Sequence, residues 1–254
     1  MTTPTIDLMH RHGSVRKFKA DPVPAEAVET VVAAAQRGST SSNLQVVSVI
    51  AVTDPAKRQR LAEICGQEHV AQAPLVLVWC ADLRRLDRAC ELRGYSQVTE
   101  YVENFLVCVL DVGIAAQNGC LAAESLGLGI CYLGSIRNDL PGVIDLLNLP
   151  RLVVPVVGMT VGWPAVPPPV RPRLPVSAVL FWETYNQAHQ DAALHEYDGT
   201  MIATGIYQGR QVPVPGKLGA VEEYGWLEHS ARRVAQALRT DLRSVLKRQG
   251  FPLE

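Results

Sequence analysis

The sequence predicts a fold of the α+β class, in which helices and strands are mixed. Runs of apolar and β-branched residues predict strands at residues 46–52, 75–80, 130–133 and 152–161. Apolar residues at helical spacing predict helices around these strands, the longest over residues 99–126. Because helices and strands do not alternate strictly, an α+β arrangement is favoured over a doubly wound parallel sheet.

The shorter predicted helices have local signals of their own. The helix expected over residues 24–36 begins at the end of Asp21-Pro22-Val23-Pro24. It carries Glu26 and Glu29 near its start, where negative charge suits the helix dipole. Asp54-Pro55 opens a helix that reaches about Cys65. Further helices are expected over residues 5–12 and 221–249.

The long helix over residues 99–126 predicts an assembly. About 28 residues at 1.5 Å per residue span roughly 42 Å, enough to cross a whole domain. Apolar residues such as Leu110 lie off its main apolar stripe, so it must be buried on several faces. One subunit can cover one side and a second copy the other, which predicts a homodimer; a central helix in a monomer is the alternative. Asp111 and Glu124 within it argue against a membrane span.

The composition excludes several classes of protein. The chain has 254 residues, with 24 Lys or Arg against 25 Asp or Glu and a formal charge of −1. A general nucleic-acid binder would show a basic excess or face, and 48% hydrophobic residues are too many for a disordered chain. No secretory signal is visible, and the six cysteines lack the spacing of a zinc knuckle or CxxC pair. We therefore expect a cytoplasmic protein with buried, reduced thiols that binds neither nucleic acid nor membrane.

Two separate cationic segments suggest a phosphate site. Residues 10–19 hold four Lys or Arg and two His, and residues 171–175 present Arg171 and Arg173 on a proline-stiffened chain. Arginine binds phosphate through two parallel hydrogen bonds, so the segments could close on one phosphate from two sides. Taken singly, each could equally be a solvated surface segment. We expect no metal at His10-x-His12, because no nearby carboxylate or cysteine completes a site.

Two further segments could line a ligand pocket. Residues 39–45 form a polar loop whose hydroxyl and amide groups could bind a polar chain, although such a segment can also be a simple loop. Gly127, Gly129 and Gly134 follow a helix and flank a strand, which excludes a dinucleotide-binding Rossmann motif. Residues 132–135 would instead bring backbone groups close to a flat ligand. The sequence has no G-x-S-x-G, P-loop or H-E-x-x-H motif and no recognisable acid–base pair.

These segments occur in an order that carries a family resemblance, covering about residues 5–185. They are His12-x-Ser14-x-Arg16, the loop ending in Leu44-Gln45, Gly66-Gln67-x-His69-Val70-Ala71-Gln72-Ala73-Pro74, Cys80-Ala81-Asp82, Ala116-Gln117-Asn118, residues 122–129, residues 132–137, Gly162-Trp163-Pro164 and residues 171–175. The chain resembles the oxygen-insensitive NADPH nitroreductase and NADPH–flavin reductase branch of the FMN-dependent nitroreductase family.

The resemblance implies a nitroreductase-like α+β fold, with a central mixed or antiparallel sheet flanked by helices and a long central helix at a dimer interface. It implies a homodimer with one FMN in each interface. Residues 1–189 would form the FMN-binding domain. Residues 190–254, weakly patterned up to 220, would form a C-terminal extension, a loop excursion plus a terminal helix, packed on the dimer.

The resemblance also implies the site residues. The expected FMN contacts are His12, Ser14, Arg16, Thr40, Ser41, Ser42, Gln45, Gln67, Tyr132, Leu133, Gly134, Arg171 and Arg173. Arg210 and Lys217 are candidates for NADPH binding by position. The chain departs from its relatives at Gly13, where they have a basic residue, and at Arg171, where lysine is commoner.

The implied activity is an FMN-dependent NADPH oxidoreductase. Hydride would pass from NADPH through flavin N5 to nitroaromatics, quinones, flavins or related small-molecule acceptors, by a ping-pong mechanism. No side chain is expected to be catalytic, because the flavin carries the chemistry, and no metal is expected. The alternative is a flavin-binding or flavin-transforming protein of the same fold with little nitroreductase turnover.

Overall fold

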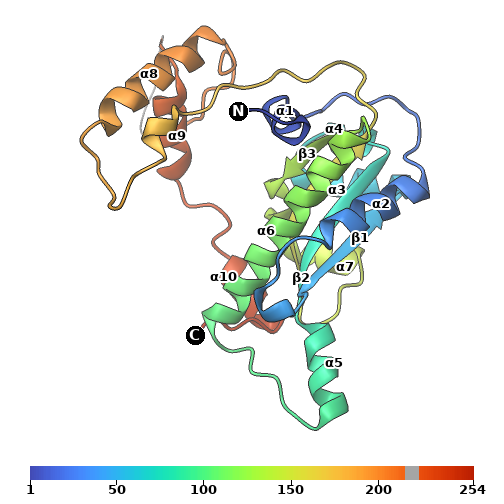
Figure 1. The fold of residues 1–254 in the computed structure, drawn as a ribbon. Coiled ribbons are helices and arrows are strands. Elements are labelled where there is room, and N and C mark those ends of the chain that lie inside the picture. The colour runs from blue at the N-terminus through green and yellow to red at the C-terminus, as the bar shows by residue number, and fades with distance from the viewer. Residues whose placement is uncertain (215–222) are drawn as a thin grey trace. The chain divides into compact units, whose positions relative to one another are not determined.

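The computed structural model describes residues 1–214 and 223–254 (Figure 1). The predicted role of Lys217 and the start of the helix expected at residue 221 lie outside the described residues. The chain divides into two compact units, one formed by residues 1–170 with 239–254 and the other by residues 171–238.

The first unit is built on an antiparallel sheet of four strands. These are β1 (Val47–Val52), β2 (Leu75–Asp82), β3 (Gly129–Leu133) and β4 (Val153–Gly162), in the order β1-β2-β4-β3. Every neighbouring pair is antiparallel. The predicted α+β class and central antiparallel sheet are confirmed, and the predicted strands differ from the observed ones by one or two residues.

Helices surround this sheet. They are α1 (Pro4–His10), α2 (Ala25–Ala35), α3 (Pro55–Cys65), α4 (His69–Gln72), α5 (Arg84–Arg93), α6 (Val102–Ser125), α7 (Leu140–Leu146) and α10 (Leu242–Arg248), with short 3₁₀ turns η1 (Ser41–Asn43) and η2 (Gly134–Arg137). Helix α3 shows how local sequence signals set the start and the end of a helix. The Asp54 carboxylate accepts the N–H of Lys57 at 2.8 Å, Pro55 occupies the first turn, and Gly66 ends the helix at a φ of 61°.

The fully buried strand β2 divides the core into two layers. Leu75, Leu77 and Trp79 point to the face covered by α2 and α6. Val76, Val78 and Cys80 point to the opposite face, where they pack with side chains of α3 and α7. This alternation follows from the period of two along a strand, and apolar cover on both faces explains why the run is continuously hydrophobic.

Within a single chain, only one face of helix α6 is buried. Cys108, Val112 and Ala116 belong to its buried face. On its other face Leu106 is 50% exposed, Leu110 56% and Ile114 41%. By length and composition α6 could also cross a membrane, a test that the core helix of a soluble protein passes as well.

The second unit corrects two expectations. Residues 190–220 were expected to be a loop, yet α8 (Gln190–Ala203) forms there; the unit also holds η3 (Val176–Ala178). The single terminal helix expected over residues 221–249 is instead α9 (Trp226–Val234) and α10, separated by a segment in which Arg239 has a φ of 55°. A right-handed helix cannot contain that φ.

The break in the terminal segment has a packing reason. Helix α9 packs with α8, and Asp198 of α8 accepts the N–H of Leu227 at 2.7 Å. Helix α10 belongs to the first unit, where Val245 and Leu246 join a core cluster that includes Phe251. Each helix buries its apolar side within a different unit.

The contact between α6 and β2 yields a stability prediction. A Cβ atom at position 119 would lie 2.9 Å from ring atoms Cη2 and Cζ2 of the fully buried Trp79. We expect Gly119→Ala to lower the free energy of unfolding by about 1–2 kcal/mol, because overpacking outweighs the gain of about 1 kcal/mol in helix propensity. Urea unfolding measures the change.

Gly199→Ala in α8 is the matched control, because a Cβ atom there meets nothing within 4 Å. It should leave stability unchanged or raise it slightly. Equal stability of the two variants would contradict the close packing of α6 on Trp79.

Candidate functional site

The cationic segment that follows α1 runs as an extended chain beside the sheet. The Val15 N–H donates to the carbonyl of Ile130 at 2.8 Å, and the Ala165 N–H donates to the carbonyl of Lys17 at 2.9 Å. Gly13 and Val15 are buried, whereas the alternate residues His12, Ser14 and Arg16 are partly or fully exposed. The three predicted phosphate ligands therefore share one side of this segment.

The departure at Gly13 has a steric explanation. A Cβ atom there would lie 2.9 Å from the Cβ of Pro168 and 2.9 Å from the carbonyl oxygen of Pro169. Pro168 and Pro169 therefore occupy the space that the Cβ atom of a basic side chain at position 13 would need. The loss of that charge accompanies a close packing of two chain segments.

His12 is fixed by an acidic residue of α6. Its Nδ1 lies 2.6 Å from Oε1 of Glu124, whose side chain is 10% exposed, and 4.0 Å from Sγ of Cys120. Burial, followed by the charge of Glu124, raises the pKa of the Cys120 thiol to about 12. In the sequence, the i, i+4 spacing of Cys120 and Glu124 on a helix indicates that these two side chains are neighbours. It does not indicate that His12 lies beside them.

A second group of predicted residues meets around η2. The Gln67 amide donates to the hydroxyl of Ser135 at 2.6 Å. Burial, followed by the positive charge of Arg16, lowers the pKa of His69. Leu133 is buried in the core, so only its backbone is available to a ligand.

Tyr132 belongs to the same strand end but has a different environment. Its hydroxyl lies 3.4 Å from Oε1 of Gln117 on α6. Burial, followed by the proximity of Cys120 and Glu124, raises the pKa of the Tyr132 phenol. The phenol therefore stays neutral at physiological pH, and the backbone of residues 132–134 remains the part that could meet a flat ligand.

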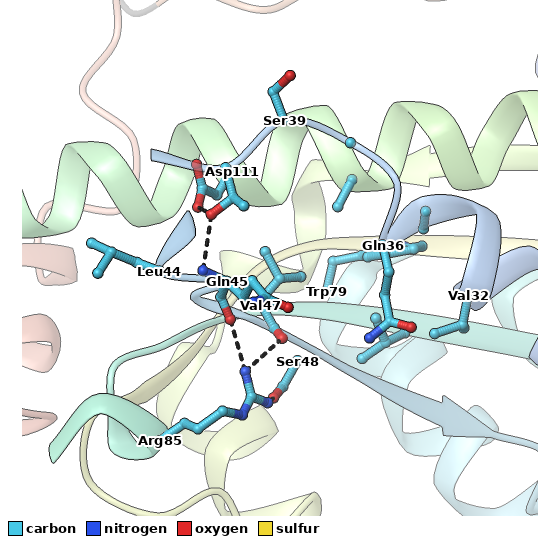
Figure 2. A pocket seen from close by; sticks show the side chains of 15 residues that line it. Val32, Gln36, Ser39, Leu44, Gln45, Val47, Ser48, Trp79, Arg85 and Asp111 are labelled. Atoms are coloured by element: carbon cyan, nitrogen blue, oxygen red, sulfur yellow. Dashed lines mark hydrogen bonds between the residues drawn. The ribbon is translucent and has the colours of Figure 1, made fainter. Parts of the chain in front are cut away.

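The polar loop of residues 39–45 is held by Asp111 of α6. The Asp111 carboxylate accepts the Thr40 hydroxyl at 2.5 Å, and the Gln45 N–H donates to the Thr40 oxygen at 2.9 Å (Figure 2). The same carboxylate accepts the Ser41 N–H at 3.1 Å. Ser42 and Gln45 adopt φ angles of 47° and 54°. Asp111 is 4% exposed and was not among the predicted site residues.

This loop borders a cavity of about 460 Å³. Figure 2 shows Arg85 at one side of it, where its guanidinium donates to the Gln45 carbonyl at 2.8 Å and to the Ser48 hydroxyl at 3.0 Å. Trp79 and Ala115 contribute apolar walls. The cavity thus combines an apolar floor with a rim of backbone and hydroxyl groups, as small-molecule sites do.

The two groups of predicted residues occupy different stretches of α6. Thr40 is anchored on Asp111 and His12 on Glu124. Thirteen residues along a helix correspond to about 20 Å. Within one chain the structure therefore brings His12 to the C-terminal part of α6, and it anchors the Thr40–Gln45 loop about 20 Å away along the same helix.

The remaining predicted residues belong to the second unit. The Arg173 guanidinium donates to the carbonyls of Arg171 and Pro172 at 3.3 and 3.2 Å, and Tyr197 donates to the Pro172 carbonyl at 3.2 Å. The charge of Arg171 reaches Tyr207, whose pKa is nevertheless raised, chiefly by burial. Arg210 is exposed. These contacts hold the arginine-bearing segment in place.

The sheet, the helices that flank it and the polar site define a nitroreductase-type fold. A solved structure described as NfrA2 of B. megaterium superposes with a TM-score of 0.91 at 33% identity, covering 100% of both chains. The family model "Nitroreductase family" matches residues 9–71 and 65–163, and the model of its C-terminal domain matches residues 171–254.

Curated relatives agree with these matches. An FMN reductase (NADPH) of Bacillus subtilis is 38% identical over 252 residues, 97% of this chain and 98% of that protein. An oxygen-insensitive NADPH nitroreductase of Salmonella typhimurium is 36% identical over 250 residues, 98% of each. The chain belongs to the nitroreductase family, and the family and fold class predicted from its sequence are confirmed.

The anchoring of the polar loop yields a second prediction. Asp111→Ala leaves the Thr40 hydroxyl and the Ser41 N–H without their acceptor. We expect the free energy of unfolding to fall by about 2–3 kcal/mol, because hydrogen bonds to a charged group each contribute about 1.5–3 kcal/mol. Urea unfolding at one fixed protein concentration measures the change.

Glu103→Ala, at an exposed position of the same helix, is the control and should change stability by no more than about 0.5 kcal/mol. If Asp111→Ala were as stable as this control, Asp111 would not be what holds the loop.

Proposed function

We propose that the chain is an FMN-dependent oxidoreductase that takes electrons from NADPH and passes them to small-molecule acceptors such as nitroaromatics, quinones or free flavins. The names of its relatives, FMN reductase (NADPH) and oxygen-insensitive NADPH nitroreductase, support the flavin and the electron donor. When bound, FMN supplies the hydride-accepting N5 atom for a ping-pong exchange between donor and acceptor. The chain's own residues bind, orient and shield it.

The FMN assignment rests on the exposure of the Arg16 side chain and on its lack of a hydrogen bond or ion pair within the described residues. His12 and Ser14 face the same side of the extended segment. A guanidinium fork beside a histidine and a hydroxyl is a donor set that fits a phosphate group. The donors present therefore suit the phosphate end of FMN.

Other residues would hold the rest of the cofactor. The Gln67 amide, already bonded to Ser135, would face the isoalloxazine with the backbone of Tyr132, Leu133 and Gly134. Thr40, Ser41, Ser42 and Gln45 would offer hydroxyl and amide groups to its polar chain. Arg171 and Arg173 would complete the phosphate site, and Arg210 and Lys217 would bind NADPH.

We further propose that the active form is a homodimer in which two chains build each site. The apolar face of α6 around Leu110 is exposed in a single chain, and a second copy would cover it. The distance of about 20 Å along α6 between the anchors Asp111 and Glu124 supports a shared site. The His12–Arg16 segment of one chain would then face the Thr40–Gln45 loop of its partner.

The domain division and the location complete the proposal. Residues 1–189 would form the FMN-binding domain, and residues 190–254 a C-terminal extension packed on the dimer. This functional division differs from that of the compact units, in which residues 239–254 belong to the first and residues 171–238 to the second. All six cysteines are free, which suits a reducing cytoplasm. Asp111, Gln117 and Glu124 of α6 bond to neighbouring segments of the chain, which favours a role within the dimer over a membrane span.

The FMN assignment predicts the behaviour of an Arg16→Ala variant. Loss of a charge-assisted hydrogen bond of about 1.5–3 kcal/mol should weaken FMN binding roughly tenfold to a hundredfold. Equilibrium dialysis of the full-length chain against FMN measures the dissociation constant.

In the wild type, stopped-flow absorbance should show NADPH reducing the bound flavin faster than NADH, followed by reoxidation with nitrofurazone or a quinone.

Lys57→Ala, which removes an exposed cation from α3, is the control and should bind FMN as the wild type does. A chain that binds no FMN would overturn the proposal. Bound flavin that NADPH reduces only very slowly would instead favour the flavin-binding or flavin-transforming alternative.

The dimer predicts a separate outcome for Leu110→Arg. A charge at the centre of the exposed apolar face would have to be buried in the interface, so the variant should sediment as a monomer in analytical ultracentrifugation. It should also lose FMN, because each site would lack the partner's loop. Gln59→Arg, which adds the same charge at an exposed position of α3, is the control and should remain dimeric. A dimeric Leu110→Arg variant would count against α6 as the interface.

A further inference from the structure

Three potential metal ligands converge where the N-terminal segment meets the C-terminal part of α6. Nδ1 of His12 lies 2.6 Å from Oε1 of Glu124 and 4.0 Å from Sγ of Cys120. One ligand atom from each of the three residues lies within 4.8 Å of the other two. Cys120 and Glu124 are four residues apart on α6, so both side chains lie on the face that His12 approaches.

The burial of this cluster differs from that of a surface group of charges. Cys120 is fully buried and the side chain of Glu124 is 10% exposed, whereas that of His12 is 27% exposed. Oε2 of Glu124 is buried and has no hydrogen-bond partner. A buried carboxylate oxygen without a partner is costly, and each such atom requires an explanation.

We propose that His12, Cys120 and Glu124 form a Zn²⁺ site. Cys120 and Glu124 have no role in the proposed FMN site, and His12 would bind the metal through Nδ1, which leaves its other ring nitrogen for the FMN phosphate. Zn²⁺ accepts imidazole nitrogen, thiolate sulfur and carboxylate oxygen together, whereas Mg²⁺ and Ca²⁺ require oxygen ligands. Three protein ligands leave a fourth tetrahedral position on the exposed side of His12 for water or a small anion.

The site forms by a balanced exchange. The metal replaces the proton of the Cys120 thiol, which leaves to solvent. It also replaces the His12–Glu124 hydrogen bond, and the proton of His12 Nδ1 is lost to solvent while Nε2 of the neutral ring carries the remaining N–H. Two zinc ligands at tetrahedral angles are about 3.4 Å apart, so His12 must withdraw slightly from its present 2.6 Å contact. His12 is on a partly exposed extended segment and can make that movement, while the two ligands on α6 stay in place.

The site joins parts of the chain that are remote in sequence. His12 is 108 residues from Cys120 and 112 from Glu124. Bound zinc would tie the segment that carries Ser14 and Arg16 to α6. The expectation that no metal is bound rested on the sequence around His10 and His12, whereas Cys120 and Glu124 approach His12 only in the folded chain.

Isothermal titration calorimetry of the FMN-loaded, full-length chain with Zn²⁺ tests the proposal. We expect one zinc per chain in the wild type. Cys120→Ala should weaken the binding by at least about a hundredfold, because even the loss of an outer-shell partner costs 10- to 100-fold. Cys108→Ala is the matched control. It removes an equally buried thiol from the same helix and should leave zinc affinity unchanged.

A second measurement does not depend on the stability of a variant. The ¹¹³Cd NMR spectrum of the wild-type chain titrated with Cd²⁺ should show one resonance in the range of mixed nitrogen, oxygen and single-sulfur coordination. Absence of stoichiometric zinc binding in the wild type, or Cys120→Ala binding zinc as tightly as Cys108→Ala, would overturn the proposal. A cadmium resonance without sulfur coordination would overturn it as well.

Discussion

The packing of α6 across one face of the sheet is the contact on which the rest of the structure depends. The fit is tight where Gly119 meets Trp79, and it fixes the orientation of the whole helix. Asp111 is thereby aimed at the Thr40 loop, and Glu124 at His12. The same helix therefore forms the core and positions both groups of candidate cofactor ligands, so its stability and the geometry of the site are physically linked.

The two faces of α6 have different requirements. The side toward the sheet needs close packing, which explains small residues such as Gly119 and Ala116 in contact with large ones from β2. The opposite side presents Leu110 and its neighbours, which suits a second copy of the chain. Two acidic residues are accommodated within the helix because their carboxylates bond to defined partners: Asp111 to the loop and Glu124 to His12.

Charge distribution distinguishes structural arginines from those available to a ligand. On α5, Arg84 lies 2.5 Å from Asp87 and Arg88 lies 2.7 Å from Glu91. Such exposed pairs contribute little to stability, but they occupy the guanidinium groups of Arg84 and Arg88. Arg16 has no such contact within the described residues, and its field reaches His69. A formal charge of −1 for the whole chain therefore says little about where an anionic cofactor would bind.

The sequence by itself determined the α+β class, the strands to within a residue or two, and the family, because hydrophobic period and motif order are local properties. It did not reveal Asp111 as the anchor of Thr40, or Glu124 and Cys120 as the neighbours of His12, since these contacts join residues 71 to 112 apart. The prediction of one continuous terminal helix was also wrong. Apolar residues continue at helical spacing past Arg239, but α9 and α10 are separate helices that pack in different units. Periodicity reports that a side chain is buried; only the tertiary structure decides which side chain it is buried against.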